Sequence, residues 1–268
     1  DYDIGSPLYN LAVVVDDNFM KISHVVRGED HISNTAKQIL IYKALNYQLP
    51  IFSHTPLILN SEGKKLSKRD SVTSINDFKK MGYLPDAMAN YMALLGWSVK
   101  ADETEIQTID EIAKKFDLKD VNKAGAKFNW EKLNWINSQH IKNMEVNDLH
   151  EIFKEYWQEK GWEAHSNKWG LELTNLLQDS IIVLNDIEDQ SAPFFEIPEI
   201  ENDGVVFLKE NSKNSLEKIY ELLNQEDINI KKPVAKNLID KISHENSIKK
   251  SIVMRSLRVA FFGCLSGP

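Results

Sequence analysis

Short β-rich runs alternate with a helix-like segment over residues 1–74, and this alternation constrains the fold most strongly. Ile22–Val26, PIFSH and PLILN have strand composition and are bounded by turn residues. Ser33–Asn46 has the pattern of a helix, with Ser33 or Asn34 as the expected N-cap. LYNLAVVVDD suits either a strand or a buried helix turn. The pattern predicts an α/β fold for this first part.

Residues 75–143 have mostly helical patterns. In LPDAMANYMALLGW, proline occupies a first-turn position and glycine marks the expected end. Thr108 and Glu111 have the spacing of a capping box. Apolar residues recur with helical spacing, and we expect them to form the core: Met88, Tyr91, Met92 and Leu95 on one helix, and Trp130, Leu133 and Ile136 on another.

Residues 144–268 are predicted to be entirely helical. Leu173, Leu176, Leu177, Ile181 and Leu184 follow helical spacing. The charge is uneven, with 15 acids against 3 lysines over residues 145–203, and 10 Lys/Arg against 6 acids over residues 213–258. The late excess of cations fits either a basic binding face or an ordinary solvated helical surface.

Composition is that of an ordinary globular protein of one or two domains, with 268 residues, 42% hydrophobic and 27% charged. A single cysteine excludes an internal disulfide and favours a reducing, cytoplasmic setting. No apolar run approaches the ~18 residues that span a bilayer. Both ends of the sequence look internal, so we expect a fragment of a longer protein.

The segment EGKKLSKRD, from Glu62 to Asp70, carries four cationic side chains in nine residues, although the net charge of the chain is −8. Lysine is a compact, mobile point charge that suits phosphate oxygens. Such a loop can stabilise charge on a reacting triphosphate. On charge alone, a solvated surface loop or a localisation-like basic patch fits better than a phosphate clamp. The Walker pattern G-x-x-x-x-G-K-[ST] is absent.

Several motifs occur in an order that resembles one family. KLSKR (Lys65–Arg69) is similar to the KMSKS motif of class I aminoacyl-tRNA synthetases. The upstream block SPLYNLAVVVDDNFMKISHVVRGEDHISNT and the later LPDAMANYMALLGW and FNWEKLNWINSQHI resemble the glutamyl-tRNA synthetase family over essentially the whole chain.

The resemblance implies a three-part organisation. Residues 1–74 would be the second half of a Rossmann-type catalytic domain, 75–143 a helical stem-contact region, and 144–268 an all-α anticodon-binding domain. The family's HIGH motif, which opens the nucleotide-binding fold, is absent from this sequence. Half of a doubly wound sheet leaves an unpaired edge and an uncovered apolar face.

The resemblance also implies roles for individual residues. Lys68 would contact ATP phosphates during activation, and Lys65 and Ser67 would support the loop, with Leu66 and Arg69 also at the nucleotide. Asp30 would approach the nucleotide or its ribose, and Ile58 would meet adenine through its backbone. Arg27 would pair with a carboxylate of glutamate, with Tyr9 and Val13 lining the pocket.

Some of these residues also fit a structural role. Arg27 could form an ion pair with Glu29 or Asp30 at the surface. Tyr9 could be a core residue. For Arg27 the neighbouring acids alone favour the ion pair, and the binding role follows from the resemblance, with which the planar bidentate match of a guanidinium to a carboxylate agrees.

The activity that the resemblance implies is a glutamate–tRNA ligase. It would use ATP as a substrate, with Mg²⁺ on the phosphates and no metal held by the protein. Its partners would be L-glutamate and tRNA(Glu), with charging of tRNA(Gln) left open, and a monomer is expected. The alternative is a tRNA-binding module without catalytic activity, because the HIGH motif is absent from the sequence.

Overall fold

The computed structural model describes residues 5–60, 62–64, 74–99, 103–211, 216–217, 220–221, 232–245 and 248–265. The chain divides into two compact units. The first comprises residues 1–144 with 182–184, and the second comprises residues 145–181 with 185–268. The predicted segments 1–74 and 75–143 both fall in the first unit, and the three-part division stays a prediction.

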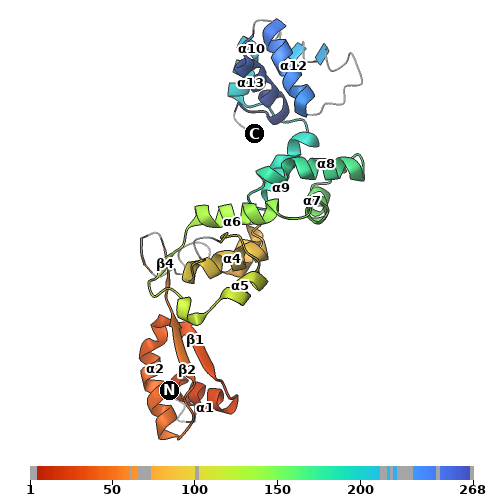
Figure 1. Cartoon of the computed structure of the whole chain (residues 1–268). Coiled ribbons are helices and arrows are strands. Elements are labelled where there is room, and N and C mark those ends of the chain that lie inside the picture. The colour runs from red at the N-terminus through yellow and green to blue at the C-terminus, as the bar shows by residue number, and fades with distance from the viewer. Residues whose placement is uncertain are drawn as a thin grey trace. The chain divides into compact units, whose positions relative to one another are not determined.

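The first unit opens with a small α/β layer. It contains α1 (Tyr9–Phe19), β1 (His24–Gly28), the 3₁₀ turn η1 (Glu29–His31), α2 (Ile32–Ala44) and β2 (Ile51–Thr55). Strands β1 and β2 pair in parallel, with Arg27 opposite His54. Helix α2 is the crossover that parallel pairing requires, and Figure 1 shows it running alongside the two strands. The α/β prediction for this part is confirmed.

The structure decides one expectation that the sequence left open and corrects another. The ambiguous run becomes helix α1, because Val14 is buried completely while α1 packs against α2. The predicted N-cap of α2 at Ser33 or Asn34 is wrong. The cap position is His31, without a side-chain cap bond, because η1 leads directly into the helix.

The rest of the first unit is mainly helical, as predicted. Its elements are β3 (Ile58–Leu59), α3 (Ile75–Lys80), α4 (Pro85–Gly96), α5 (Ile109–Lys115), η2 (Leu118–Asp120), β4 (Ala126–Lys127) and α6 (Trp130–Lys142). Thr108 and Glu111 form the predicted capping box. The apolar core of these elements consists of Phe78, Tyr83, Ala87, Tyr91, Leu95, Leu133 and Ile136.

Two expected core residues lie at the surface. Met92 and Trp130 are exposed, while their helical neighbours Tyr91 and Leu133 are buried. The ring of Trp130 still packs on Phe128, with ring centroids 5.0 Å apart. Helical spacing identified the correct helices, but the buried stripe of each is narrower than the predicted apolar face.

The second unit is helical throughout its described residues. It contains α7 (Val146–Glu159), α8 (Asn167–Leu177), η3 (Gln178–Ser180), α9 (Asp186–Ser191), η4 (Ala192–Phe194), α10 (Asn202–Asn211), α12 (Lys232–Glu245) and α13 (Lys250–Phe262). The leucine pattern that begins at Leu173 does not form one helix. Helix α8 ends at Leu177, so Ile181 and Leu184 lie beyond it, and Leu176 is exposed.

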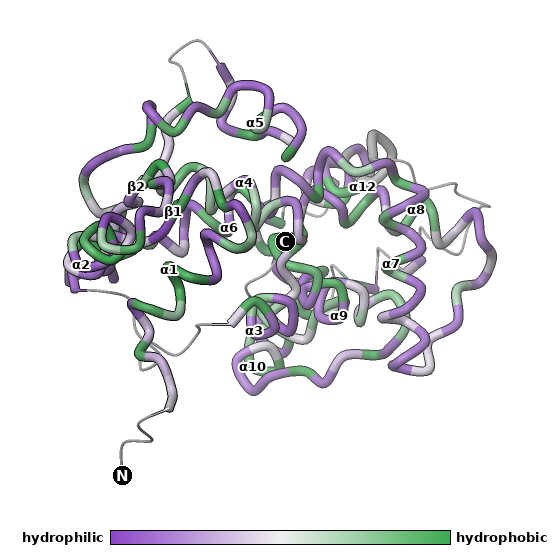
Figure 2. The backbone as a smooth tube through the Cα atoms, turned by 90° about the horizontal axis from the view of Figure 1, so that it is seen from below, coloured by the Kyte–Doolittle hydropathy of each residue, from purple (hydrophilic) through white to green (hydrophobic). Residues whose placement is uncertain are grey.

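The first unit exposes many large apolar side chains on its opening elements. Leu8 is 74% exposed and Phe19 is 85% exposed, and Figure 2 shows the hydrophobic run along α1. Leu8 and Phe19 belong to α1 and its N-cap, so the uncovered face expected for half of a doubly wound sheet stays a prediction. None of the helices in the described part of the chain is long and apolar enough to span a bilayer.

Candidate active site

Most of the predicted ligand-binding residues in the described part lie near the carboxyl ends of β1 and β2. Arg27 is the penultimate residue of β1, Asp30 follows that strand, and Ile58 lies three residues after β2. Open α/β sheets bind ligands at the carboxyl ends of their parallel strands. The parallel register therefore gathers residues that are up to 31 positions apart in the sequence.

Arg27 is held by two side chains of α2. Its Nη2 nitrogen donates to Oγ1 of Thr35 at 2.6 Å and to Oε1 of Gln38 at 2.7 Å. Thr35 is 7% exposed and Gln38 is 2% exposed. Neither Glu29 nor Asp30 is a hydrogen-bond partner of this guanidinium in the described part of the chain, so the predicted alternative of a local ion pair is not what the structure shows.

The two α2 side chains have further partners on neighbouring elements. Gln38 donates through Nε2 to Oδ1 of Asn10 on α1, at 3.1 Å. Thr35 Oγ1 lies 2.8 Å from Nε2 of His54 on β2 and 3.1 Å from the carbonyl oxygen of His31. The polar network thus connects α1, β1, α2 and β2 around Arg27.

An aromatic ring and a carboxylate complete the surroundings of Arg27. The guanidinium carbon lies 5.6 Å from the centre of the Phe52 ring, a distance at which a cation attracts the ring face. Burial raises the pKa of Asp17 from its usual value, and the nearby Arg27 charge partly offsets this. Asp17 was not among the predicted site residues.

Tyr9 and Val13 lie one turn apart on α1. Tyr9 is 52% exposed, so its alternative reading as a core residue is wrong. Its ring centroid lies 6.3 Å from that of His31, which brings the start of α1 near η1. Val13 is partly buried. The ring contact places Tyr9 beside η1, and Val13 follows it one turn later on the same helix.

Asp30 lies in η1, where the chain leaves β1. Its side chain is exposed, and a Cβ atom at Gly28 would come within 2.6 Å of Oδ1. Glu29 beside it accepts a hydrogen bond from the backbone N–H of Leu57 at 3.3 Å. This bond joins η1 to the segment that follows β2. The bond therefore connects the turn that contains Asp30 with the residue before Ile58.

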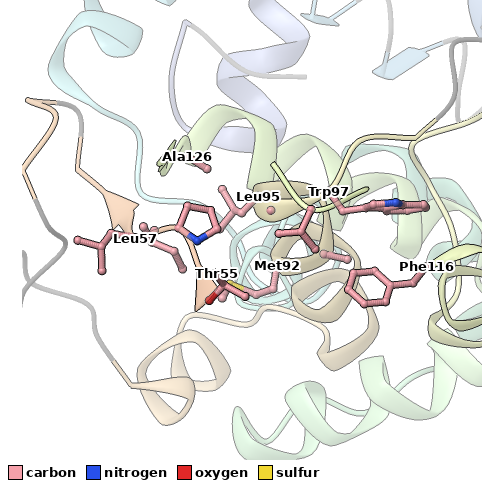
Figure 3. A pocket seen from close by; sticks show the side chains of 12 residues that line it. Thr55, Leu57, Met92, Leu95, Trp97, Phe116 and Ala126 are labelled. Carbon is pink, nitrogen blue, oxygen red and sulfur yellow. The ribbon is translucent and has the colours of Figure 1, made fainter. Parts of the chain in front are cut away.

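Ile58 begins β3, which pairs in parallel with β4. Its partly buried side chain packs against the core around Phe78. A cavity of about 220 Å³ lies beside it, and Figure 3 shows its mainly apolar walls, which include Leu57, Met92, Trp97 and Phe116.

The KLSKR residues Lys65, Leu66, Ser67, Lys68 and Arg69 lie outside the described residues. The turn immediately before them is described. Asn60 Oδ1 accepts from the backbone N–H groups of Glu62 and Lys64 at 3.1 and 3.0 Å, and Gly63 has a φ of +81°. A left-handed glycine is suited to this tight turn.

The family models divide the chain between two domains. Residues 3–135 match the model "tRNA synthetases class I (E and Q), catalytic domain", and residues 148–268 match the model "Anticodon binding domain". A glutamate–tRNA ligase from Prochlorococcus marinus subsp. pastoris is 66% identical over 269 residues, which cover 99% of this chain and 56% of the relative. The chain belongs to the class I glutamate and glutamine tRNA synthetase family.

Solved members of this synthetase family have the same fold. A glutamate–tRNA ligase from Elizabethkingia meningosepticum, crystallised "in complex with its amino acid", matches with a TM-score of 0.82 and 32% identity, over 98% of this chain and 55% of that one. The enzyme from Elizabethkingia anophelis matches with a TM-score of 0.80 and 33% identity, over the same shares. This synthetase chain spans about half the length of the relatives it matches.

The sequence reasoning for this synthetase chain missed the partners of Arg27: Asn10, Thr35, Gln38 and His54. A signal was available on α2. Thr35 and Gln38 are polar, three positions apart, and therefore lie on one face of the helix. A pair of buried polar residues on a helix face requires partners, which could have been sought on β1.

Proposed function

We propose that this chain is part of a glutamate–tRNA ligase. The enzyme would join a carboxylate of L-glutamate to the α-phosphorus of ATP and release pyrophosphate. It would then transfer the glutamyl group to the 3′-terminal adenosine of tRNA(Glu) and release AMP. The observation that carries this proposal is the Arg27 guanidinium, held at the sheet edge by buried partners in a chain 66% identical to a named glutamate–tRNA ligase.

The described residues suit binding of glutamate and ATP. Arg27 supplies the positive charge for a glutamate carboxylate, and Tyr9 and Val13 form the adjacent wall. Asp30 accepts a hydrogen bond from the ATP ribose. The backbone of Ile58 meets the adenine, while its side chain contacts the core around Phe78. The exposure of Tyr9 and Asp30, and the contact of the Tyr9 ring with His31 next to Asp30, support these roles.

The KLSKR segment would act on the phosphates of ATP. Lys68 stabilises the transition state of activation, Lys65 and Ser67 support the loop, and Leu66 and Arg69 also contact the nucleotide. Removal of one well-placed donor to a developing charge costs roughly 3–4 kcal/mol of transition-state stabilisation. The hydrogen bonds from Glu62 and Lys64 to Asn60 would anchor this segment after β3.

Mg²⁺ is proposed to bind the phosphates of ATP. This ion keeps several of its waters and is commonly held by substrate phosphates together with one or two carboxylates. Among the described residues, no group of three or more His, Cys, Asp or Glu side chains could hold a metal ion. The ion would supply charge neutralisation for the departing pyrophosphate.

Residues 148–268 would bind the anticodon arm of tRNA. Lys241, Lys249 and Arg255 are exposed cations on or beside α12 and α13, and they suit contacts with phosphates. Which of tRNA(Glu) and tRNA(Gln) is charged depends on contacts with the anticodon. The proposal retains a monomer in a reducing, cytoplasmic compartment, on the basis of the family and the single cysteine.

A tRNA-binding module without activation activity is the second candidate. The observation behind it is that residues 148–268 match the model "Anticodon binding domain". This candidate predicts tRNA binding that weakens with salt, since phosphate contacts release counterions.

The test uses a hybrid protein in which this entire chain replaces the matching 269 residues of the Prochlorococcus marinus relative. Lys68→Ala should lower the rate of glutamyl-adenylate formation by roughly 100-fold or more, with tRNA affinity nearly unchanged. Ser33→Ala, an exposed hydroxyl on α2, is the control. Equal losses in activation and tRNA binding would contradict the role of Lys68. A hybrid that binds tRNA but forms no adenylate would favour the second candidate.

A further inference from the structure

The two hydrogens of Arg27 Nη2 are both engaged. Thr35 Oγ1 and Gln38 Oε1 each accept one hydrogen bond from this nitrogen, at 2.6 and 2.7 Å. An Nη nitrogen carries two hydrogens, so these acceptors use its full capacity. Both acceptors belong to buried side chains of α2, where competition from water is small.

The orientation of each acceptor is set by a second bond. The Gln38 amide donates through Nε2 to Asn10 Oδ1 at 3.1 Å, which keeps its oxygen toward Arg27. A hydroxyl has a single hydrogen and can accept two hydrogen bonds. When Thr35 donates to the carbonyl oxygen of His31, its two acceptor positions take Arg27 Nη2 and His54 Nε2. All partners of the hydroxyl are thereby satisfied.

The remaining nitrogens of Arg27 differ in access. Nε is buried and has no hydrogen-bond partner, and the Phe52 ring lies 5.6 Å from the guanidinium carbon. Nη1 also has no hydrogen-bond partner among the described residues, but unlike Nε it is not fully buried. Nη1 is therefore the guanidinium nitrogen that an incoming ligand can reach.

This arrangement changes the expected contact with a carboxylate. The two parallel, bidentate geometries use Nη2 together with either Nη1 or Nε. Each would require Nη2 to release Thr35 or Gln38. While both acceptors stay bound to Nη2, a carboxylate can form hydrogen bonds with Nη1 only. This differs from the bidentate contact that was expected from the sequence.

We propose that Thr35 and Gln38 are positioning residues that hold Nη2 of Arg27 and so direct Nη1 at a carboxylate of the bound amino acid. This inference rests on the proposed function, in which Arg27 binds glutamate. Thr35 and Gln38 do not touch the substrate. They contribute by fixing the orientation of the guanidinium plane. Asn10 on α1 holds Gln38 in place, and His54 on β2 holds Thr35 in place.

The experiment compares variants of the hybrid in ATP–pyrophosphate exchange with tRNA present. Thr35→Val and Gln38→Met remove the acceptors with little change in side-chain size. Each should raise the KM for glutamate about tenfold, because a hydrogen bond to a charged group is lost. The KM for ATP and kcat should change little. Thr35→Ser keeps the hydroxyl and should behave like the unsubstituted hybrid, as should the exposed control Ser33→Ala.

Several outcomes would overturn the proposal. Variants that are folded by circular dichroism and keep an unchanged KM for glutamate would show that the orientation of Arg27 does not depend on these residues. A lower KM would show that Thr35 and Gln38 compete with the substrate for Nη2. If Gln38→Met does not fold, the test rests on the KM for glutamate of Thr35→Val compared with that of Thr35→Ser. An unsubstituted hybrid without glutamate-dependent exchange would instead contradict the proposed function itself.

Discussion

The Nδ1 nitrogen of His150 lies 2.9 Å from Oγ1 of Thr174 in the buried contact between α7 and α8. Thr174 donates its hydrogen to the carbonyl oxygen of Gly170 at 3.0 Å. The imidazole must therefore donate to Thr174, with its proton on Nδ1. A Cβ atom at Gly170 would come within 2.6 Å of the His150 ring, so the glycine allows this close approach.

This contact predicts a loss of stability in mild acid. Burial lowers the pKa of His150 below its ordinary value of 6.5, and Lys154 adds to the effect while Asn167 and Glu151 oppose it. The unfolded chain thus binds a proton more readily than the folded chain. The contribution of His150 to stability should be full above about pH 6.5 and should decline as pH falls below that value.

Thermal unfolding of the chain, followed by circular dichroism from pH 8 to pH 5, measures this effect. The double variant His150→Leu with Thr174→Val removes the titrating group and its partner, and should reduce the decline. His165→Gln, at an exposed histidine of the same unit, should leave it unchanged. An equal decline in all three proteins would show that His150 is not responsible.

Asn137 should be essential for the stability of the first unit. It is fully buried on α6, where its Oδ1 accepts from the backbone N–H of Leu84 at 2.9 Å and its Nδ2 donates to the carbonyl oxygen of Ile182. Asn137→Ala would remove both hydrogen bonds of this buried amide side chain and should cost about 1–3 kcal/mol in the free energy of unfolding. Denaturant unfolding measures this. Asn143→Ala, at the exposed end of the same helix, should cost far less. A loss below 1 kcal/mol at position 137 would contradict the account.

Gly28→Ala should affect the nucleotide site selectively. Its Cβ would come within 2.6 Å of Asp30 Oδ1, so the exposed Asp30 side chain would have to turn away. Loss of one hydrogen bond to ATP should raise its KM about fivefold in the hybrid, with the KM for glutamate unchanged. Gly96→Ala, where the nearest atom is 4.0 Å away, is the matched control. Equal changes in both constants would exclude this assignment of Asp30.

Arg27→Lys should impair glutamate binding although it keeps the charge. A lysine ammonium lacks the planar group that spans Thr35, Gln38 and the substrate together. The KM for glutamate should rise about 10- to 100-fold, and the KM for ATP should change little. Lys43→Arg, an exposed residue near the end of α2, serves as a control that also keeps the charge. An unchanged KM for glutamate would mean that Arg27 has a structural role.

The elements that sequence reasoning identified correctly depend on short-range chemistry. The capping box at Thr108 and Glu111 uses contacts within one turn, and the proline at the start of α4 needs only its own φ. Short-range patterns could not decide whether the residues of α1 form a helix or a strand. Its valines favour a strand, and packing of Val14 against α2 determined the helix.

The site shows the same division between local and long-range information. The motifs located Arg27, Asp30 and Ile58, and the parallel register of β1 and β2 explains why they gather at one edge. The partners of Arg27 lie 8 and 11 positions away on another element. No local pattern specifies that Nη2 is occupied, so the bidentate contact inferred from residue type alone differs from the geometry observed.

The central claim is that this chain supplies part of a glutamate-activating site. ATP–pyrophosphate exchange with tRNA present, run on the 268-residue chain and on the hybrid, tests it most directly. The account predicts glutamate-dependent exchange by the hybrid and none by the chain alone. Inactivity of both, with tight tRNA binding by the short chain, would contradict the account and identify a tRNA-binding protein instead.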